Sequence, residues 1–225
     1  MRVLALETST EYCSVALWRD GAITQRSEWV GQKHSEMLME MLDALLRASN
    51  VKLAQLDGIA FGMGPGSFTG VRIACGVTQG LALGANLAVV GVCTLQALAA
   101  ASGKSRVIAA LDARMGEIYF AAYEKRAGVW VAAVEPCLCK PENSPPVEND
   151  DWFGVGSGFA VHCAMLTDRY AGQLRGSDSD VVPQAAAIAA LGATQFALGC
   201  GVDAAQALPL YLRDKVALKT YERNA

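Results

Sequence analysis

Apolar runs at the start of the chain predict three neighbouring strands. Residues 2–7 (RVLALE) form a short continuous run that is typical of a central strand, and residues 12–18 (YCSVALW) alternate between inward and outward positions. The sequence RDG at 19–21 is a hairpin signal that leads into a third run at 23–30. We therefore expect the chain to begin with an antiparallel meander.

Residues 33–50 (KHSEMLMEMLDALLRASN) predict a helix whose apolar arc is unusually wide. Its charged residues Glu36, Glu40, Asp43 and Arg47 fall on one narrow stripe, and the other positions are mainly leucine and methionine. A helix on the surface of a monomer needs only one apolar face. Either this helix is nearly buried within the chain or its second face meets a partner. The methionines favour a partner, because methionine is common at adaptable binding surfaces.

The stretch 61–84 (FGMGPGSFTGVRIACGVTQGLALG) joins a predicted strand at 56–61 to a helix through a glycine-rich turn. The helix is expected to begin near Ser67, with Ser67 or Thr69 as its N-cap. Seven residues of the stretch are glycine, and a glycine inside a helix lowers its stability by roughly 0.5–1 kcal/mol relative to alanine. A helix that keeps several glycines is expected to approach another backbone or a ligand closely.

The pattern of the first half recurs after the middle of the chain. A predicted strand at 106–111 ends in Asp112 and is followed by strands at 117–124 and 128–134. The order strand, acid, turn, strand, strand thus occurs twice, which indicates a structural duplication. The remaining elements are expected as a strand at 87–93, a short helix at 94–102 with Thr94 as its cap, a proline-rich loop at 136–151, and helices at 159–168 and 183–198.

Composition narrows the class of protein. The chain has 225 residues, 52% of them hydrophobic, with a net charge of −3 and a pI of about 5.4. This acidic balance argues against a free-standing nucleic-acid binder, which normally carries a basic face. We expect no signal peptide, and we expect the apolar segment 185–202 to be a buried helix rather than a membrane span.

The seven cysteines and two histidines limit the possible metal chemistry. There is no Cys-x-x-Cys pair, and Cys137-x-Cys139 is too tight and lacks the second pair of a zinc site. Reduced cysteines in a cytosolic protein fit this pattern best. His34 is expected to be a surface or cap residue and His162 a structural one, so we find no nucleophile–base pair.

Two turns could hold a phosphate or could be purely structural. The turn 62–67 (GMGPGS) lies between a strand and a helix, where free amides can bind an anion. It lacks the lysine of a P-loop and the spacing of a dinucleotide fingerprint. The segment 7–11 (ETSTE) offers hydroxyls and amides at the first strand end. The alternative for both is a tight turn that serves packing. A third turn, 112–117 (DARMGE), carries charges that are expected to pair with each other or with a partner.

Five motifs, in order over essentially the whole chain, resemble the TsaB family, also known as the YeaZ-like or glycoprotease-like proteins. They are ETST from residue 7, GMGPGSFTGVRIACGVTQGLA from residue 62, CTLQALA from residue 93, LDARMGEIY from residue 111 and PLYLR from residue 209. The resemblance implies an α/β fold of the actin-like ATPase (sugar kinase, Hsp70 and actin) superfamily, with two related lobes that each start with an antiparallel meander. We assign residues 1–103 to an N-terminal lobe, on which 209–225 is expected to pack, and residues 104–208 to a C-terminal lobe.

The resemblance also implies a part in forming threonylcarbamoyladenosine beside the anticodon of tRNAs that read ANN codons. In that pathway TsaC makes threonylcarbamoyl-adenylate, and TsaD transfers the threonylcarbamoyl group to tRNA. TsaB pairs with TsaD, and the ATPase TsaE joins them. The histidines of TsaD's metal motif align with Thr94 and Leu98 here, and neither residue binds a metal as histidine does. The resemblance therefore implies a cytoplasmic scaffold with no catalytic residue, no metal and no required cofactor. It would reach tRNA only through the complex and would form a homodimer in isolation.

Two candidate sites follow from the resemblance. Weak binding of ATP or ADP would use Thr8, Ser9, Gly64, Gly66 and Ser67. Docking on TsaD would use the 33–50 helix and part of the 67–84 helix, namely His34, Met37, Leu38, Met41, Leu42, Leu45, Arg72, Cys75, Gly76, Gln79 and Gly80. The alternative from another class is an independent small-molecule kinase or ATPase on the same fold, although Thr8-Ser9 stands where glycine is usual in such a first turn.

Overall fold

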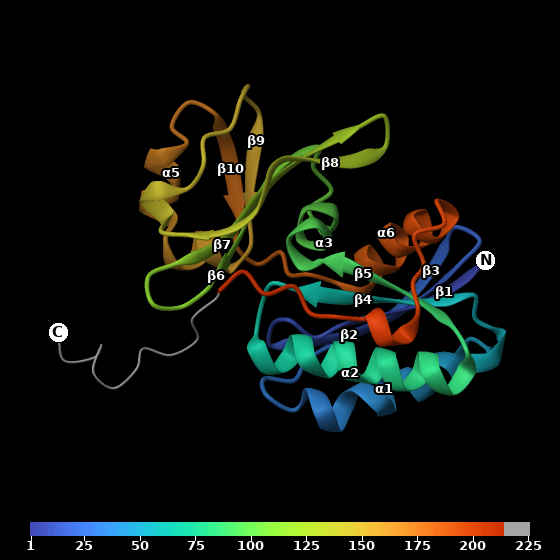
Figure 1. Ribbon diagram of the computed structural model, residues 1–225. Coiled ribbons are helices and arrows are strands. Elements are labelled where there is room, and N and C mark those ends of the chain that lie inside the picture. Colours follow the sequence, from blue (N-terminus) through green and yellow to red (C-terminus); the bar gives the residue numbers. More distant parts are fainter. Residues whose placement is uncertain (214–225) are drawn as a thin grey trace.

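The computed structural model describes residues 1–213, which form two mixed five-stranded sheets with helices packed around them (Figure 1). The first sheet has the order β3-β2-β1-β4-β5, and the second has the order β10-β9-β6-β7-β8. In each sheet three strands of a meander pair antiparallel, and two later strands extend the sheet in parallel. The predicted duplication is confirmed, and the fold class is α/β.

The strands follow the predicted apolar runs closely. The first sheet contains β1 (Arg2–Glu7), β2 (Tyr12–Arg19), β3 (Ala22–Trp29), β4 (Gly58–Gly64) and β5 (Ala88–Cys93). The second contains β6 (Arg106–Asp112), β7 (Ile118–Arg126), β8 (Val129–Cys139), β9 (Trp152–Val155) and β10 (Leu174–Asp178). Asp20 and Gly21 have positive φ angles between β2 and β3, which confirms the predicted hairpin turn.

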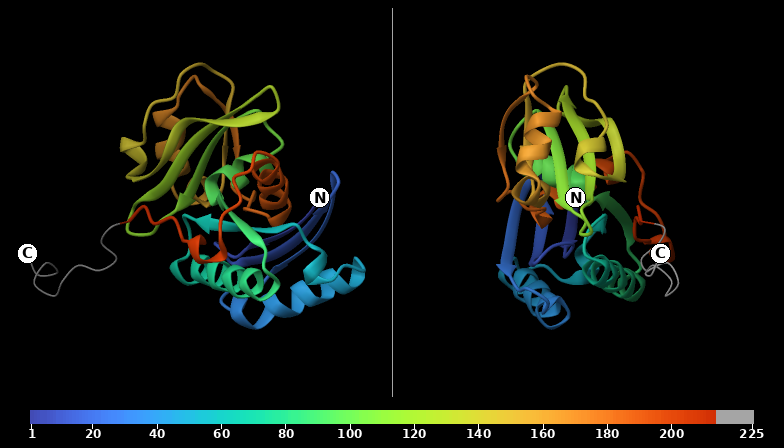
Figure 2. Two further views of the ribbon diagram at one scale, coloured as in Figure 1. Left: turned by 45° about the vertical axis from the view of Figure 1, so that its right-hand side comes forward. Right: turned by 90° about the vertical axis from the view of Figure 1, so that its left-hand side faces the viewer.

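Helices cover both faces of the first sheet (Figures 1 and 2). The helices α1 (His34–Ala48) and α2 (Phe68–Ala85) lie on one face, and α6 (Ala185–Ala197) lies on the other. Because both faces are covered, β1 is buried along nearly its whole length and reads as a continuous apolar run. The edge strand β3 is exposed throughout.

The second sheet packs in a similar way. The helix α3 (Thr94–Ala101) lies between the two sheets and contacts β6 and β7. The short helices α4 (Ser157–Val161) and α5 (Cys163–Arg169) cover the opposite face. Single 3-10 turns complete the fold at η1 (Leu53–Gln55), η2 (Pro141–Asn143) and η3 (Ala204–Gln206). Among residues 1–213, none of the helices has the length and apolar character that crossing a membrane requires.

The predicted C-terminal lobe of residues 104–208 is too long, because α6 returns to the first sheet. A Cβ at Gly192 of α6 would lie 2.4 Å from the Cβ of Ala60 in β4. Val202 and Val89 donate their amides to each other's carbonyl at 2.9 Å. The first lobe therefore consists of two separate parts of the chain. The expected packing of 209–225 falls partly on residues 214–225, which lie outside the described residues.

Two local predictions are also corrected, and one strand was missed. The strand β8 runs to Cys139, into the segment expected to be a loop, because Cys137 and Cys139 pair with β7 and pack on the second core. The strand β10 was not predicted, since LRGSD is short and polar. Cys93, not Thr94, is the N-cap position of α3, and Thr94 is its first residue.

Candidate functional site

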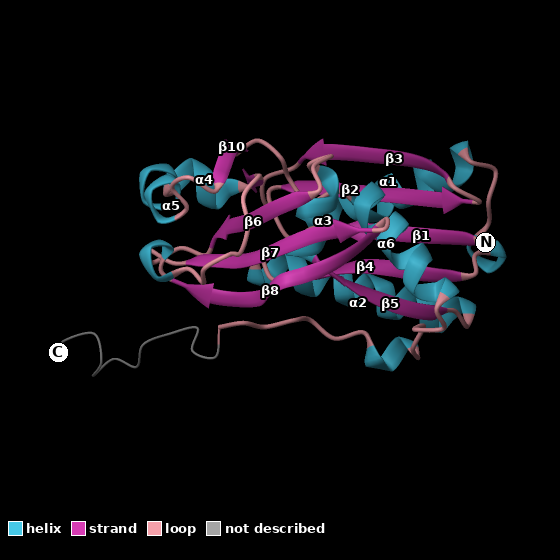
Figure 3. Cartoon of the chain, turned by 90° about the horizontal axis from the view of Figure 1, so that it is seen from above, coloured by secondary structure: helices cyan, strands magenta, loops and turns pink. Residues whose placement is uncertain are grey.

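Hydrogen bonds join four of the five sequence motifs at the junction of the two sheets. The end of β1 contacts the β4–α2 turn, where the Ser67 amide donates to the Ser9 carbonyl at 2.8 Å. Residues 207–213, here called the strap, run past the edges of both sheets (Figure 3). The Leu210 amide donates to the Met63 carbonyl at 2.7 Å, and the Arg213 guanidinium donates to the Ala113 carbonyl at 2.9 Å. The motifs thus form one connected structure.

Three glycines allow the β4–α2 turn to lie against the end of β1. A Cβ at Gly62 would lie 1.9 Å from Glu7 Oε2, and a Cβ at Gly70 would lie 1.9 Å from the Thr8 carbonyl oxygen. A Cβ at Gly66 would lie 2.6 Å from Ser9 Cβ. No side chain fits at these separations, so these glycines serve close packing within the chain.

The candidate phosphate-binding residues lie together, but several of their hydrogen-bond donors are already used within the chain. These residues are Thr8, Ser9, Gly66 and Ser67. The Thr8 hydroxyl donates to the Gly70 carbonyl at 2.7 Å, and the Ser67 amide is taken by Ser9. Ser67 also caps α2, as predicted, by accepting from the Gly70 amide at 3.4 Å. Within residues 1–213 the buried Ser9 hydroxyl has no hydrogen-bond partner. Gly64, the fifth candidate, has a φ of +101°. A Cβ at this position would lie 3.0 Å from the Leu210 carbonyl oxygen of the strap.

Glu7 is a buried acid beside this turn. Its Oε1 accepts the Ser9 amide, whereas its Oε2 is buried with no hydrogen-bond partner among the described residues. Burial raises the pKa of the Glu7 carboxyl above its ordinary value. The space that Gly62 leaves is filled by this carboxyl group.

The charges of the 112–117 turn pair as the sequence predicted. Arg114 lies 3.1 Å from Asp112 of its own turn and 4.0 Å from Glu11 of the first lobe. Glu117 lies 2.8 Å from Arg213 of the strap. The sequence analysis identified the PLYLR motif, but it did not predict that Arg213 of this motif would bind the 112–117 turn.

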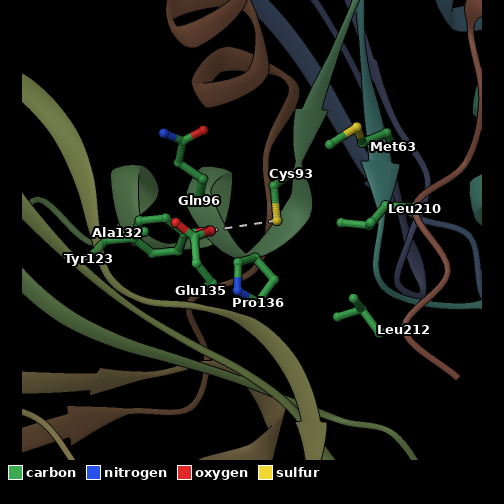
Figure 4. Close-up of a pocket in the computed structure, with 9 residues that line it drawn as sticks. All are labelled: Met63, Cys93, Gln96, Tyr123, Ala132, Glu135, Pro136, Leu210 and Leu212. Carbon is green, nitrogen blue, oxygen red and sulfur yellow. Dashed lines mark hydrogen bonds between the residues drawn. The ribbon is translucent and has the colours of Figure 1, made fainter.

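A groove of about 490 Å³ opens between the lobes next to the strap (Figure 4). The Tyr123 hydroxyl donates to Cys93 Sγ at 3.7 Å inside it, and burial raises the pKa of both groups. Thr94, the first residue of α3, and Leu98, one turn later, are fully buried. The groove was not predicted from the sequence. Its lining residues are Met63, Cys93, Gln96, Tyr123, Ala132, Glu135, Pro136, Leu210 and Leu212.

Most of the predicted docking residues on α1 lie in the core, which corrects that prediction. His34 is buried, and its Nε2 lies 2.8 Å from the Thr10 carbonyl oxygen and 3.2 Å from that of Tyr12. The helix is buried on a wide arc because it packs on β2 and also touches α2. Met37 is partly buried. The corrected residues are His34, Leu38, Met41, Leu42 and Leu45.

On α2 the predicted docking residues divide between core and surface. Cys75 is buried, and both Cys75 Sγ and Gln79 Nε2 donate to the Ala207 carbonyl, at 2.8 and 2.9 Å. Gly76 and Gly80 are exposed, and a Cβ at either position would meet nothing within 4 Å. These two glycines therefore lie on an open helix surface.

An exposed cation–aromatic stack continues this surface. The Arg72 guanidinium lies 3.3 Å from the centroid of the Phe68 ring and 5.3 Å from that of Tyr211. Both rings are nearly half exposed. Positions 68, 72, 76, 80 and 84 form a row of i, i+4 neighbours that winds gradually around α2, and Gly84 also has open space around it. We call this row the α2 face.

Comparison with known families gives one matching model and several close relatives. The model described as TsaD, tRNA N6-adenosine threonylcarbamoyltransferase, matches residues 27–221. The tRNA threonylcarbamoyladenosine biosynthesis protein TsaB of Escherichia coli is 37% identical over 97% of this chain and 97% of its own. The TsaB of Haemophilus influenzae is 36% identical over 97% of this chain and 96% of its own.

Two solved structures from Pseudomonas aeruginosa are similar over the whole fold. YeaZ superposes with a TM-score of 0.87 at 40% identity, and the match covers 94% of this chain and 99% of that one. A protein described as similar to peptidase YeaZ superposes with a TM-score of 0.88 at 39% identity, with the same coverage. The two-sheet architecture is therefore common to these proteins.

Proposed function

The chain belongs to the TsaB family of tRNA threonylcarbamoyladenosine biosynthesis proteins, and we propose that it acts in that pathway as the non-catalytic partner of a TsaD-type transferase. In this proposal TsaD carries the chemistry and this chain supports it by forming a heterodimer. The modified base is the adenosine 3′ of the anticodon in tRNAs that read ANN codons. The work takes place in the cytoplasm, and tRNA is reached only through the complex.

Positive features of the junction support a non-catalytic role. The Ser67 amide and the Thr8 hydroxyl, which could have held a phosphate, are bonded within the chain. The Glu7 carboxyl fills the space beside Gly62. Thr94 and Leu98 align with the histidines of TsaD's metal motif. Both are buried, and they offer a hydroxyl and an apolar side chain in place of two imidazoles. Any affinity for ATP or ADP is proposed to be weak, with TsaD or TsaE as the main nucleotide site.

The α2 face is the observation that carries the proposed partnership. Its central glycines leave the helix backbone open to close approach by another helix, and Phe68, Arg72 and Tyr211 offer aromatic and arginine side chains at one end. Aromatic residues and arginine are enriched at the energetic centres of protein interfaces. In the absence of TsaD, the same face would pair two copies of this chain in a homodimer.

A reconstituted modification reaction tests the proposed role. Unmodified tRNA, ATP, threonine and bicarbonate are incubated with TsaC, TsaD and TsaE, with or without this chain, and the modified nucleoside is quantified. We expect threonylcarbamoyladenosine to accumulate only when the chain is present. Full modification in its absence would refute the role, and turnover of ATP by the chain alone would favour an independent ATPase.

The docking surface is tested with the variants Gly76→Arg and Gly80→Arg. Both positions have open space, so the fold is expected to be retained. Each variant should lose co-purification with TsaD, because a long charged side chain blocks close approach to the helix. The matched control is Ala190→Arg at an exposed position of α6, which should co-purify like the unaltered chain. If both glycine variants still bind TsaD, the α2 face is excluded as the docking surface. Recruitment of TsaE is tested in a second step, in which TsaE is added to the purified complex.

A further inference from the structure

A polar hollow of about 370 Å³ lies at the end of the second sheet where β6 begins and β7 ends. Three of the six residues that line it are cations, although the whole chain carries a net charge of −3. The lining residues are Ser105, Arg106, Glu124, Lys125, Arg126 and Asp151. We call this place the basic rim. The charge that remains after its internal ion pairs decides which ligands it attracts.

Strand pairing brings two arginines to one buried acid at the basic rim. Arg106 and Glu124 lie directly opposite each other on β6 and β7. Arg126 follows Glu124 by two residues, so all three side chains point to the same face of the sheet. Arg106 Nε lies 3.1 Å from Glu124 Oε1, and Arg126 Nη2 lies 2.7 Å from Glu124 Oε2. The Glu124 side chain is only 8% exposed, so it anchors both guanidinium groups at the surface.

Both arginines keep N–H donors for a ligand. Arg126 contacts Glu124 through Nε and Nη2. Arg106 contacts Glu124 through Nε, and its Nη1 donates to the Asp150 carbonyl at 2.9 Å. Within residues 1–213 these contacts use only part of the five N–H groups that each guanidinium carries. The remaining donors are held close together by the shared carboxylate.

The basic rim stays positive after its ion pairs are counted. Two arginines share the single charge of Glu124, and Asp151 is paired with Arg175 at 2.7 Å. We count the lining residues, their charged chain neighbours and the ion-pair partner Arg175. The cations are Lys104, Arg106, Lys125, Arg126 and Arg175, and the acids are Glu124, Asp150 and Asp151. Five cations against three acids give a local charge of +2, which suits an anionic ligand.

We propose that the basic rim binds phosphate groups of an RNA backbone while the complex holds its tRNA. Guanidinium groups bind phosphate oxygens through paired N–H bonds, and such contacts position a nucleic acid without reading its sequence. Lys125 and Arg126 are exposed, so a long polyanion can reach them. The identity of the RNA rests on the proposed function, whereas the site itself rests on the charges and distances of the rim.

The basic rim and the α2 face do not compete for the same surface. Figures 1 and 2 show the β7–β8 hairpin, which begins next to Arg126, and the helices α1 and α2 on opposite sides of the molecule. RNA and a protein partner can therefore be bound together. A few phosphate contacts are weak by themselves, and the acidic chain as a whole repels RNA. In a complex that holds the same tRNA elsewhere, these contacts act at a high effective concentration.

The salt dependence of tRNA binding tests the proposal on the purified complex of this chain with TsaD. The variant Lys125→Ala/Arg126→Ala removes two cations and leaves Arg106 paired with Glu124. The matched control Arg19→Ala/Arg26→Ala removes two exposed cations from the first sheet. The affinity for fluorescently labelled tRNA is measured by anisotropy from about 50 to about 200 mM salt.

The variant of the basic rim should bind tRNA about three- to tenfold more weakly at the lowest salt concentration, because it makes fewer phosphate contacts. Its slope of log Kd against log salt should be smaller by about one to two. The control should match the unaltered complex in both quantities. Lys125→Ala alone leaves both Glu124 contacts intact and should give about half of the change in slope, so the test also holds for a double variant that folds poorly.

Equal tRNA affinity and equal salt slope in the two double variants would overturn the RNA site. The same titrations with the chain alone, at about 20 mM salt, where phosphate contacts are strongest, separate this site from the proposed function. If no TsaD complex forms, the proposed function fails and the chain alone still decides the site. Inorganic phosphate is the last probe. Its binding at the rim, together with unchanged tRNA binding by the rim variant, would assign the hollow to a free anion and overturn the proposal.

Discussion

Six of the seven glycines in the stretch 61–84 divide into two groups according to what surrounds them. Gly62, Gly66 and Gly70 lie so close to the end of β1 that no side chain could be accommodated. Gly76, Gly80 and Gly84 have open space around them. The first group is explained by packing within the chain, whereas none of the described residues packs against the second group.

Alanine substitution separates the two groups by their effect on stability. Gly62→Ala should lower the free energy of unfolding by about 1–3 kcal/mol, because the added methyl overlaps the Glu7 carboxyl and forces neighbours to move. Gly76→Ala should raise it by roughly 0.5–1 kcal/mol, because alanine favours the helix and meets nothing. Urea unfolding of both variants checks the prediction, and equal effects at the two positions would contradict it.

The helix α6 shows how a sequence can predict an element without predicting its neighbours. Its residues are almost all apolar or small, so no polar stripe indicates which way it faces. In the structure Ile188 and Ala189 lie in the core of the first sheet with Val3 and Ala60. The close approach of Gly192 to Ala60 fixes the depth of this packing.

Truncation at two positions near this helix tests the assignment. Ile188→Ala should lower the free energy of unfolding by about 2–5 kcal/mol, because it leaves a cavity in a fully buried site. Leu198→Ala, just after the helix, removes a side chain that is 75% exposed and should change stability by less than about 0.5 kcal/mol. Urea unfolding measures both, and an Ile188→Ala variant as stable as Leu198→Ala would show that α6 does not pack as described.

Periodicity and turn signals in the sequence predicted nearly all elements, because those signals are local. The meander, the Ser67 cap and the duplication were confirmed for this reason. Apart from the one-residue shift of the α3 cap, what failed depends on contacts distant in sequence. The wide apolar arc of α1 left two explanations open, and the structure buries Leu38, Met41 and Leu45 within the chain's own core. The junction itself was recognised only as separate motifs, since their meeting point is set by the packing of both lobes.

At the scale of the whole molecule, the strap connects the two lobes from the outside. It is held to α2 through Ala207, to β4 through Leu210 and to the second lobe through Arg213. Arg213 is 15% exposed and Glu117 30% exposed, at an N–O distance of 2.8 Å. A partly buried pair of this kind is less screened by water than an exposed one, so it can contribute more to stability.

A double-mutant cycle measures that contribution directly. Arg213→Ala, Glu117→Ala and the double variant should give a coupling of about 1 kcal/mol in urea unfolding. The pair Arg47–Asp43 on α1 is the control, since its separation is a similar 2.9 Å but its side chains are 80% and 59% exposed. Its cycle should give about 0.3–0.5 kcal/mol. If burial strengthens the Arg213–Glu117 pair, added salt should lower the coupling energy of the exposed Arg47–Asp43 pair more than that of Arg213–Glu117. Equal coupling energies with equal salt dependence for the two pairs would mean that the Arg213–Glu117 pair contributes no more to stability than an exposed ion pair.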